Sequence, residues 1–65
     1  MINLLIDATK REMESERGKA MIKSALMNGL SPLVAVICCA QKATGRENYE
    51  ELCEIASATL DEVRI

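Results

Sequence analysis

The chain has 65 residues and a mass of 7.1 kDa, which excludes a multidomain protein, because a single hydrophobic core usually needs about 50 to 200 residues. Its composition is 49% apolar and 28% charged with a net charge of −2, which is typical of a folded protein rather than of a disordered chain. It contains no histidine, the usual proton-transfer group near neutral pH and the commonest transition-metal ligand. We therefore expect no enzyme, no metal site and no cofactor.

The cysteine content indicates reduced thiols rather than a disulfide framework. The chain has three cysteines, an odd number, and Cys38 and Cys39 are adjacent, which suits neither a disulfide scaffold nor a tetrahedral zinc site. With Cys53, we expect them to act as small core residues of a cytoplasmic protein. The longest apolar run, residues 33–40, is too short to cross a membrane, so we expect no membrane span.

The first predicted element is a long helix over residues 2–28. Its two ends are apolar, but residues 9–19 are polar, and Met13 is their only large apolar side chain. Gly18 interrupts this polar section, and a bend or hinge is expected there because glycine weakens a helix interior. The alternative is that residues 2–6 form a short strand before the helix.

The clearest local signals separate the first helix from the second, predicted over residues 31–43. Gly29 suits the left-handed position that follows a helix end. Ser31 can cap a new helix with its hydroxyl, and Pro32 has the fixed φ of a first helical residue. Residues 33–40 are apolar on every side, which indicates burial on every side, with a buried strand as the alternative.

The third helix is predicted over residues 47–63. Gly45 ends the second helix, and Asn48 with Glu51 three residues later has the spacing of a helix cap. Apolar residues then recur at helical spacing, and we expect them to face the core: Tyr49, Leu52, Cys53, Ala56, Leu60 and Val63.

These elements predict an all-α fold, a single three-helix domain over residues 1–65. Two thin amphipathic helices cannot cover every side of an apolar second helix. A second copy of the chain is the simplest cover, because small domains often complete their core by oligomerisation. We therefore expect a homodimer or a higher oligomer.

The charges are segregated along the chain. Residues 1–29 carry five basic and four acidic groups, whereas residues 46–65 carry two basic and six acidic groups. The acidic third helix has the wrong sign to read DNA, so we do not expect duplex DNA as a partner. The mixed charges of the first helix are read as a solvated face, with a basic patch for a phosphate-bearing ligand as the alternative: Lys10, Arg11, Arg17, Lys19 and Lys23.

Two groups of residues are candidate binding sites. Arg46, Asn48 and Tyr49 lie at the start of the third helix, where backbone N–H groups attract anions, so they could bind a small anionic ligand such as a nucleotide. The second group is a candidate protein interface whose methionines suit an adaptable surface: Met13, Met21, Met27, Leu33, Val36 and Ile37.

In size, acidity, helical content and lack of catalytic residue sets, the chain resembles the small accessory proteins that phages and other mobile elements use against host regulation or defence. The resemblance is one of type and carries no residue roles. It implies a non-enzymatic homo-oligomer that binds and modulates a host or regulatory protein. One alternative is a sponge for an anionic nucleotide with pockets at subunit boundaries, and another is an antitoxin-like or DNA-associated regulator.

Overall fold

The computed structural model describes residues 2–63 of the expected single domain. The elements are α1 (Ile2–Glu14), α2 (Glu16–Met27), α3 (Pro32–Thr44) and α4 (Tyr49–Glu62). The all-helical class is confirmed for these residues, and the bounds of the second and third predicted helices agree with α3 and α4 to within two residues. The expected count of three helices is wrong, because residues 2–28 form two helices. The strand alternative for residues 2–6 is also wrong.

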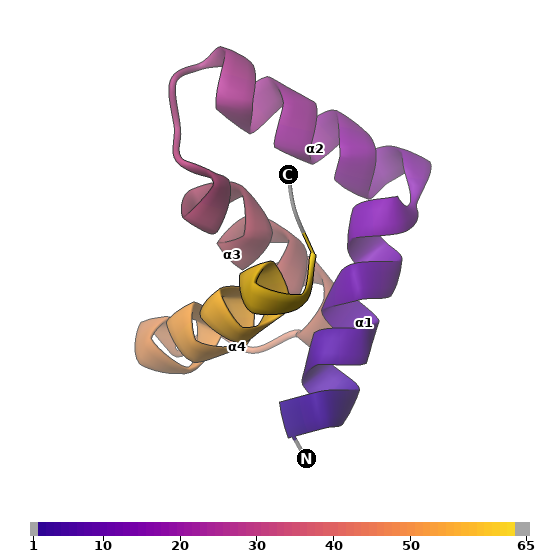
Figure 1. Ribbon diagram of the computed structural model, residues 1–65, viewed down its shortest axis with the longest axis vertical. Helices are drawn as coiled ribbons and strands as arrows, with labels where there is room; N and C mark the ends of the chain where they lie inside the picture. The colour runs from indigo at the N-terminus through magenta and orange to yellow at the C-terminus, as the bar shows by residue number, and fades with distance from the viewer. Residues whose placement is uncertain (1, 64–65) are drawn as a thin grey trace.

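The other three helices are arranged around α3 (Figure 1). In this view α1 runs up one side, α2 crosses the upper end, and α4 lies in front. Helix α3 packs against each of the other three, α4 also packs against α1, and α2 packs against α1 and α3. The α2–α3 connection and the first turn of α1 therefore lie at opposite ends of the molecule.

The break between α1 and α2 is made by Ser15, not by Gly18 as expected. Ser15 has extended backbone angles, and its hydroxyl accepts a hydrogen bond from the Gly18 N–H at 3.0 Å and donates one to the Glu12 carbonyl at 2.6 Å. Arg17 donates two hydrogen bonds back to the Glu12 carboxylate, at 3.0 and 3.1 Å. These hydrogen bonds hold the pKa of Glu12 below its ordinary value. The break between α1 and α2 is thus fixed by a side-chain cap rather than by a flexible glycine hinge.

The predicted signals between α2 and α3 are confirmed. Gly29 has φ +81°, and the Leu30 N–H donates to the Ala25 carbonyl at 3.0 Å, which is the long hydrogen bond of a Schellman motif. The Ser31 hydroxyl accepts from the Val34 N–H at 3.3 Å, and a proline occupies the first helical position.

The predicted start of α4 is also confirmed. Gly45 has φ +71°, and its N–H donates to the Gln41 carbonyl at 3.0 Å, which ends α3. The Asn48 side chain accepts from the Glu51 N–H at 3.0 Å and caps α4.

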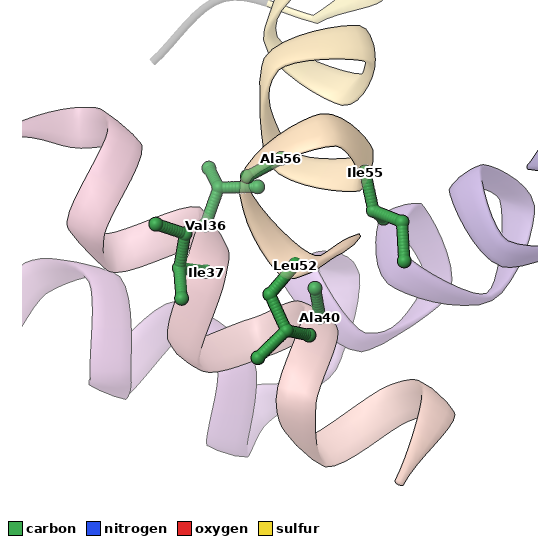
Figure 2. Close-up of a cluster of buried hydrophobic side chains, with 6 residues drawn as sticks. All are labelled: Val36, Ile37, Ala40, Leu52, Ile55 and Ala56. Carbon is green, nitrogen blue, oxygen red and sulfur yellow. The ribbon is translucent and has the colours of Figure 1, made fainter. Parts of the chain in front are cut away.

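The centre of the core is shared between α3 and α4 (Figure 2). Six buried side chains form it: Val36, Ile37, Ala40, Leu52, Ile55 and Ala56. Leu5 and Met13 of α1 pack against this cluster. The break at Ser15 turns α2 back onto α3, so α1, α2 and α4 of the same chain together cover most of this apolar helix. A second copy is therefore not needed to cover α3, which was the reason for expecting one. The oligomeric state itself stays a prediction.

Helices α1 and α4 each bury one threonine and are linked by one ion pair within the described residues. Thr9 and Thr59 are fully buried, and each satisfies its hydroxyl within its own helix, by donating to the carbonyls of Leu5 at 2.8 Å and Ile55 at 2.7 Å. Lys10 pairs with Glu62, and this hydrogen bond raises the pKa of the Lys10 ammonium. No helix in the described part of the chain is both long and apolar enough to cross a bilayer.

Candidate interaction surface

The structure brings the predicted anion-binding residues together at the start of α4, but their polar groups already have partners. Arg46 Nη1 donates to Glu51 Oε2 at 3.0 Å, and the Asn48 side chain caps the helix. Tyr49 is 68% exposed, and its interaction with the Cys53 side chain raises the pKa of the phenol. An arriving anion would have to displace Glu51 from Arg46. The predicted anion site is therefore not ready to bind, and it stays a prediction without support from this geometry.

The hollow beside Arg46 does not improve the case for an anion. It measures about 180 Å³, and its lining combines apolar side chains with two carboxylates and a single guanidinium. The lining residues are Ile2, Leu5, Arg46, Glu51, Glu54 and Ile55. Two acids against one base give this hollow a negative charge, which repels phosphate groups.

Most of the predicted interface residues contribute to the core of the single chain. Val36 and Ile37 are buried in the cluster shared by α3 and α4, and Leu33 and Met13 are half-buried against it. Their apolar pattern correctly indicates burial, but α1 and α4 provide that burial within the chain. The side chains of Val36 and Ile37 are therefore not part of the surface.

The two remaining methionines lie on α2. Met21 is half-buried and lines a cleft of about 450 Å³ together with Cys38, Gln41 and Lys42. Met27, in the last turn of α2, is 77% exposed. Of the six predicted interface residues, Met27 is the one whose side chain is largely open to solvent.

Met27 belongs to a larger exposed group, which we call the apolar corner: Leu26, Met27, Leu30 and Val34. The corner spans the last turn of α2, the connecting turn and the first turn of α3, at the upper left of Figure 1. Three members of the corner are not among the predicted interface residues. Val34 was expected to be buried because the whole of residues 33–40 is apolar, and Leu26 and Leu30 were not singled out. The adjacency of Leu26 and Met27 was the available signal of exposure, because two neighbouring side chains on a helix cannot both face one core.

The charged residues on both sides of the apolar corner in the sequence have one sign. Residues 17–46 contain no aspartate or glutamate but five basic residues, and residues 47–62 contain six acidic residues and no basic one. Arg17 and Arg46 are paired with Glu12 and Glu51. Within the described residues, the other three basic side chains form no ion pair: Lys19, Lys23 and Lys42. Lys19 and Lys23 precede the corner on α2, whereas Lys42 lies in the last turn of α3 and near Glu12 of α1. The part of α2 that leads to the corner is therefore basic, and the exposed face of α4 is acidic.

The three cysteines should differ in reactivity, and this tests how α3 is packed. Cys39 is fully buried, and burial raises the pKa of its thiol to about 11, whereas Cys38 and Cys53 are half-buried. We expect iodoacetamide to alkylate Cys39 about a hundredfold more slowly than an exposed thiol, because the reactive thiolate is rare there. Timed labelling with tandem mass spectrometry measures this, and urea-unfolded protein is the control. Equal rates for all three thiols in the folded protein would contradict the buried position of Cys39.

Comparison with protein-family models, with curated proteins and with solved structures finds no match to this chain. The described residues also contain no group of three or more histidine, cysteine or acidic side chains placed to hold a metal ion. The apolar corner and the basic side chains near it are thus the features on which a function can be argued.

Proposed function

We propose that the protein is a non-enzymatic helical interaction protein that binds and modulates another protein, with the apolar corner as its contact surface. The observation that carries the proposal is the exposure of four large apolar side chains within nine consecutive residues, 26–34, while the six residues of the core cluster are buried. Apolar surface that is grouped and bordered by polar residues is typical of protein interaction sites. The exposed thioether of Met27 suits an adaptable contact.

The apolar corner is large enough to contribute useful affinity. Full burial of a leucine or methionine side chain contributes about 1.5–3 kcal/mol, so covering the exposed part of each corner residue contributes about 1 kcal/mol. The four together would contribute about 4 kcal/mol, which corresponds to about a thousandfold in Kd. The resemblance to accessory proteins of mobile elements suggests a host or regulatory protein as the partner. Self-association is not part of this proposal, because the apolar side chains of α3, apart from Val34 and part of Leu33, are covered within the chain.

Site-specific photocrosslinking in the producing cells tests the proposal. A photoreactive benzoyl-phenylalanine replaces Met27 in the apolar corner, Leu4 at the other end of the molecule, or Ser57 on α4, and all three positions are exposed. We expect a heteromeric adduct of defined mass from position 27 and none from positions 4 and 57. Absence of an adduct at position 27, or equal adducts from all three positions, would contradict the proposed function.

A further inference from the structure

We infer that the apolar corner docks an acidic amphipathic helix of the partner protein, with its apolar residues on the corner and its carboxylates on the lysines of α2. This inference rests on the proposed function and adds the chemistry of the partner. It is carried by the arrangement of charge and apolar surface along one side of α2.

The lysines and the corner lie on one stripe of α2. Lys19, Lys23 and Met27 follow one another at intervals of four residues, which places them one above the other on a helix face. All three are exposed. The opposite face of α2 is used by the fold, since Gly18 and Ala25 are buried and Met21 and Ile22 are half-buried. The outer face of α2 therefore carries two ammonium groups in the turns that come directly before the apolar corner.

This stripe selects the sign of the partner's charge. The corner and the turns of α2 that lead to it, residues 17–34, contain no carboxylate, and the only carboxylate of α2 is Glu16 in its first turn. A positively charged segment on the corner would therefore meet two ammonium groups before it reached Glu16. An acidic segment can pair with Lys19 and Lys23, which have no ion pair within the described part of the chain. Charge complementarity of this kind speeds association and fixes the register of the bound segment.

A second copy of the chain fits this surface poorly. Two corners facing each other across a two-fold axis would offer each other apolar side chains but no carboxylate to pair with Lys19 and Lys23. The acidic face of α4 offers Glu50, Glu54 and Asp61, but Leu52 and Ile55 of that helix are buried in the core. Apart from Tyr49 at its first position, α4 therefore has charge to offer but no large exposed apolar side chain for the corner. The first two turns of α1 expose Ile2 and Leu4 but only one carboxylate, Asp7. A partner that offers apolar side chains together with several carboxylates is therefore a helix of a different protein.

An anionic membrane also fits less well than an acidic helix. A helix that lies in a membrane interface needs an apolar face along its length. The exposed residues of α2 before its last turn are polar or small: Glu16, Arg17, Lys19, Ala20, Lys23 and Ser24. On α2, large exposed apolar side chains occur only in the corner. The corner is thus a localised contact for side chains rather than a surface for acyl chains.

Titration of the full ¹⁵N-labelled chain with designed peptides, followed by NMR, tests the inference. The probe is an amphipathic leucine–glutamate helix of about four turns, long enough to form a helix when bound. One control peptide has lysine in place of every glutamate, and another has serine in place of every leucine. We expect the acidic amphipathic peptide to bind and to shift the amide signals of residues 19–34. Both control peptides should bind at least about tenfold more weakly.

Matched variants locate the contact. Met27→Ser and Lys23→Gln should each weaken binding of the acidic peptide, Met27→Ser by about tenfold and Lys23→Gln by about threefold. Leu4→Ser and Arg11→Gln replace an exposed leucine and an exposed arginine on α1 and should leave binding unchanged. Circular dichroism checks that each variant is helical, and Leu30→Ser replaces Met27→Ser if the latter is not.

Several results would overturn the inference. These are equal or tighter binding of the lysine peptide, shifts centred on α1 or α4, and equal effects of the corner and control variants. Self-association through residues 26–34, seen by light scattering, would identify a second copy of the chain, rather than an acidic helix of another protein, as the occupant of the corner. Binding to phosphatidylserine vesicles without binding to the peptide would assign the corner to a membrane. If the peptide fails while position 27 still gives a photocrosslinked protein, the acidic partner is wrong and the proposed function stands.

Discussion

Replacing Gly18 with alanine is expected to destabilise the protein by about 3 kcal/mol or more, the upper range for overpacking in a rigid site. In an ordinary helix interior the same change stabilises by about 1 kcal/mol, so the expected sign is reversed. A β-carbon at Gly18 would overlap the Glu12 carbonyl oxygen and lie 2.6 Å from the carbonyl carbon. Both atoms belong to the backbone of α1, so no side-chain rotation relieves the clash. The close approach of α2 to α1 at the Ser15 corner therefore requires glycine.

Urea unfolding followed by circular dichroism measures this effect, and the other two glycines are its controls. Gly29 and Gly45 have positive φ, but a β-carbon at either meets no atom within 4 Å. We expect Gly29→Ala and Gly45→Ala to cost about 1 kcal/mol each, from backbone conformation alone. If Gly18→Ala is as stable as the parent chain or more stable, α1 and α2 do not approach each other closely at the Ser15 break. That result would favour the continuous helix predicted from the sequence.

The boundaries that the sequence predicts well are those set by local chemistry. Ser31 and Asn48 cap their helices through their own side chains, and Gly29 and Gly45 adopt left-handed φ, which depends on residues only a few positions apart. The break at Ser15 has a similar cap, but it lies in a polar stretch without a hydrophobic period. Packing of both α1 and α2 on α3 favours the break, and that contact is not visible in the local pattern.

The candidate site was also only partly predictable from the sequence, because it depends on contacts between residues far apart in the chain. An apolar pattern indicates that Val36 and Ile37 are buried, but it does not say whether the cover comes from the same chain or from another. The pairing of Arg46 with Glu51, which occupies the predicted anion site, depends on how the loop enters α4. Met27 was predicted together with Met13 and Met21 as a flexible thioether, and only the packing of the helices shows that Met27 is the one that stays exposed. Leu30 and Val34 complete the corner only when α2 and α3 are placed together.

Replacing Ile55 with alanine is expected to lower the free energy of unfolding by about 3–4 kcal/mol, within the range for large-to-small changes at fully buried positions. Ile55 is 1% exposed and belongs to the cluster shared by α3 and α4. Alanine would leave a cavity in this cluster, and the packed helices around it can close the cavity only in part. A domain of this length has a total stability of about 3–10 kcal/mol, so the change removes a large part of it. Thermal unfolding should shift down by about 15 °C or more.

The matched control is Ile2→Ala, which makes the same chemical change at a position that is 44% exposed, and it should cost less than about 1 kcal/mol. Unfolding of the parent chain at several protein concentrations completes the test, because a fold completed within one chain has a Tm that does not depend on concentration. A large loss for Ile55→Ala with a constant Tm would place the stabilising core inside the single chain. Equal losses for both variants would contradict the different burial of Ile55 and Ile2. A Tm that rises with concentration would show that a second copy supplies part of the core. In that case the apolar corner would have to be reassigned to self-association.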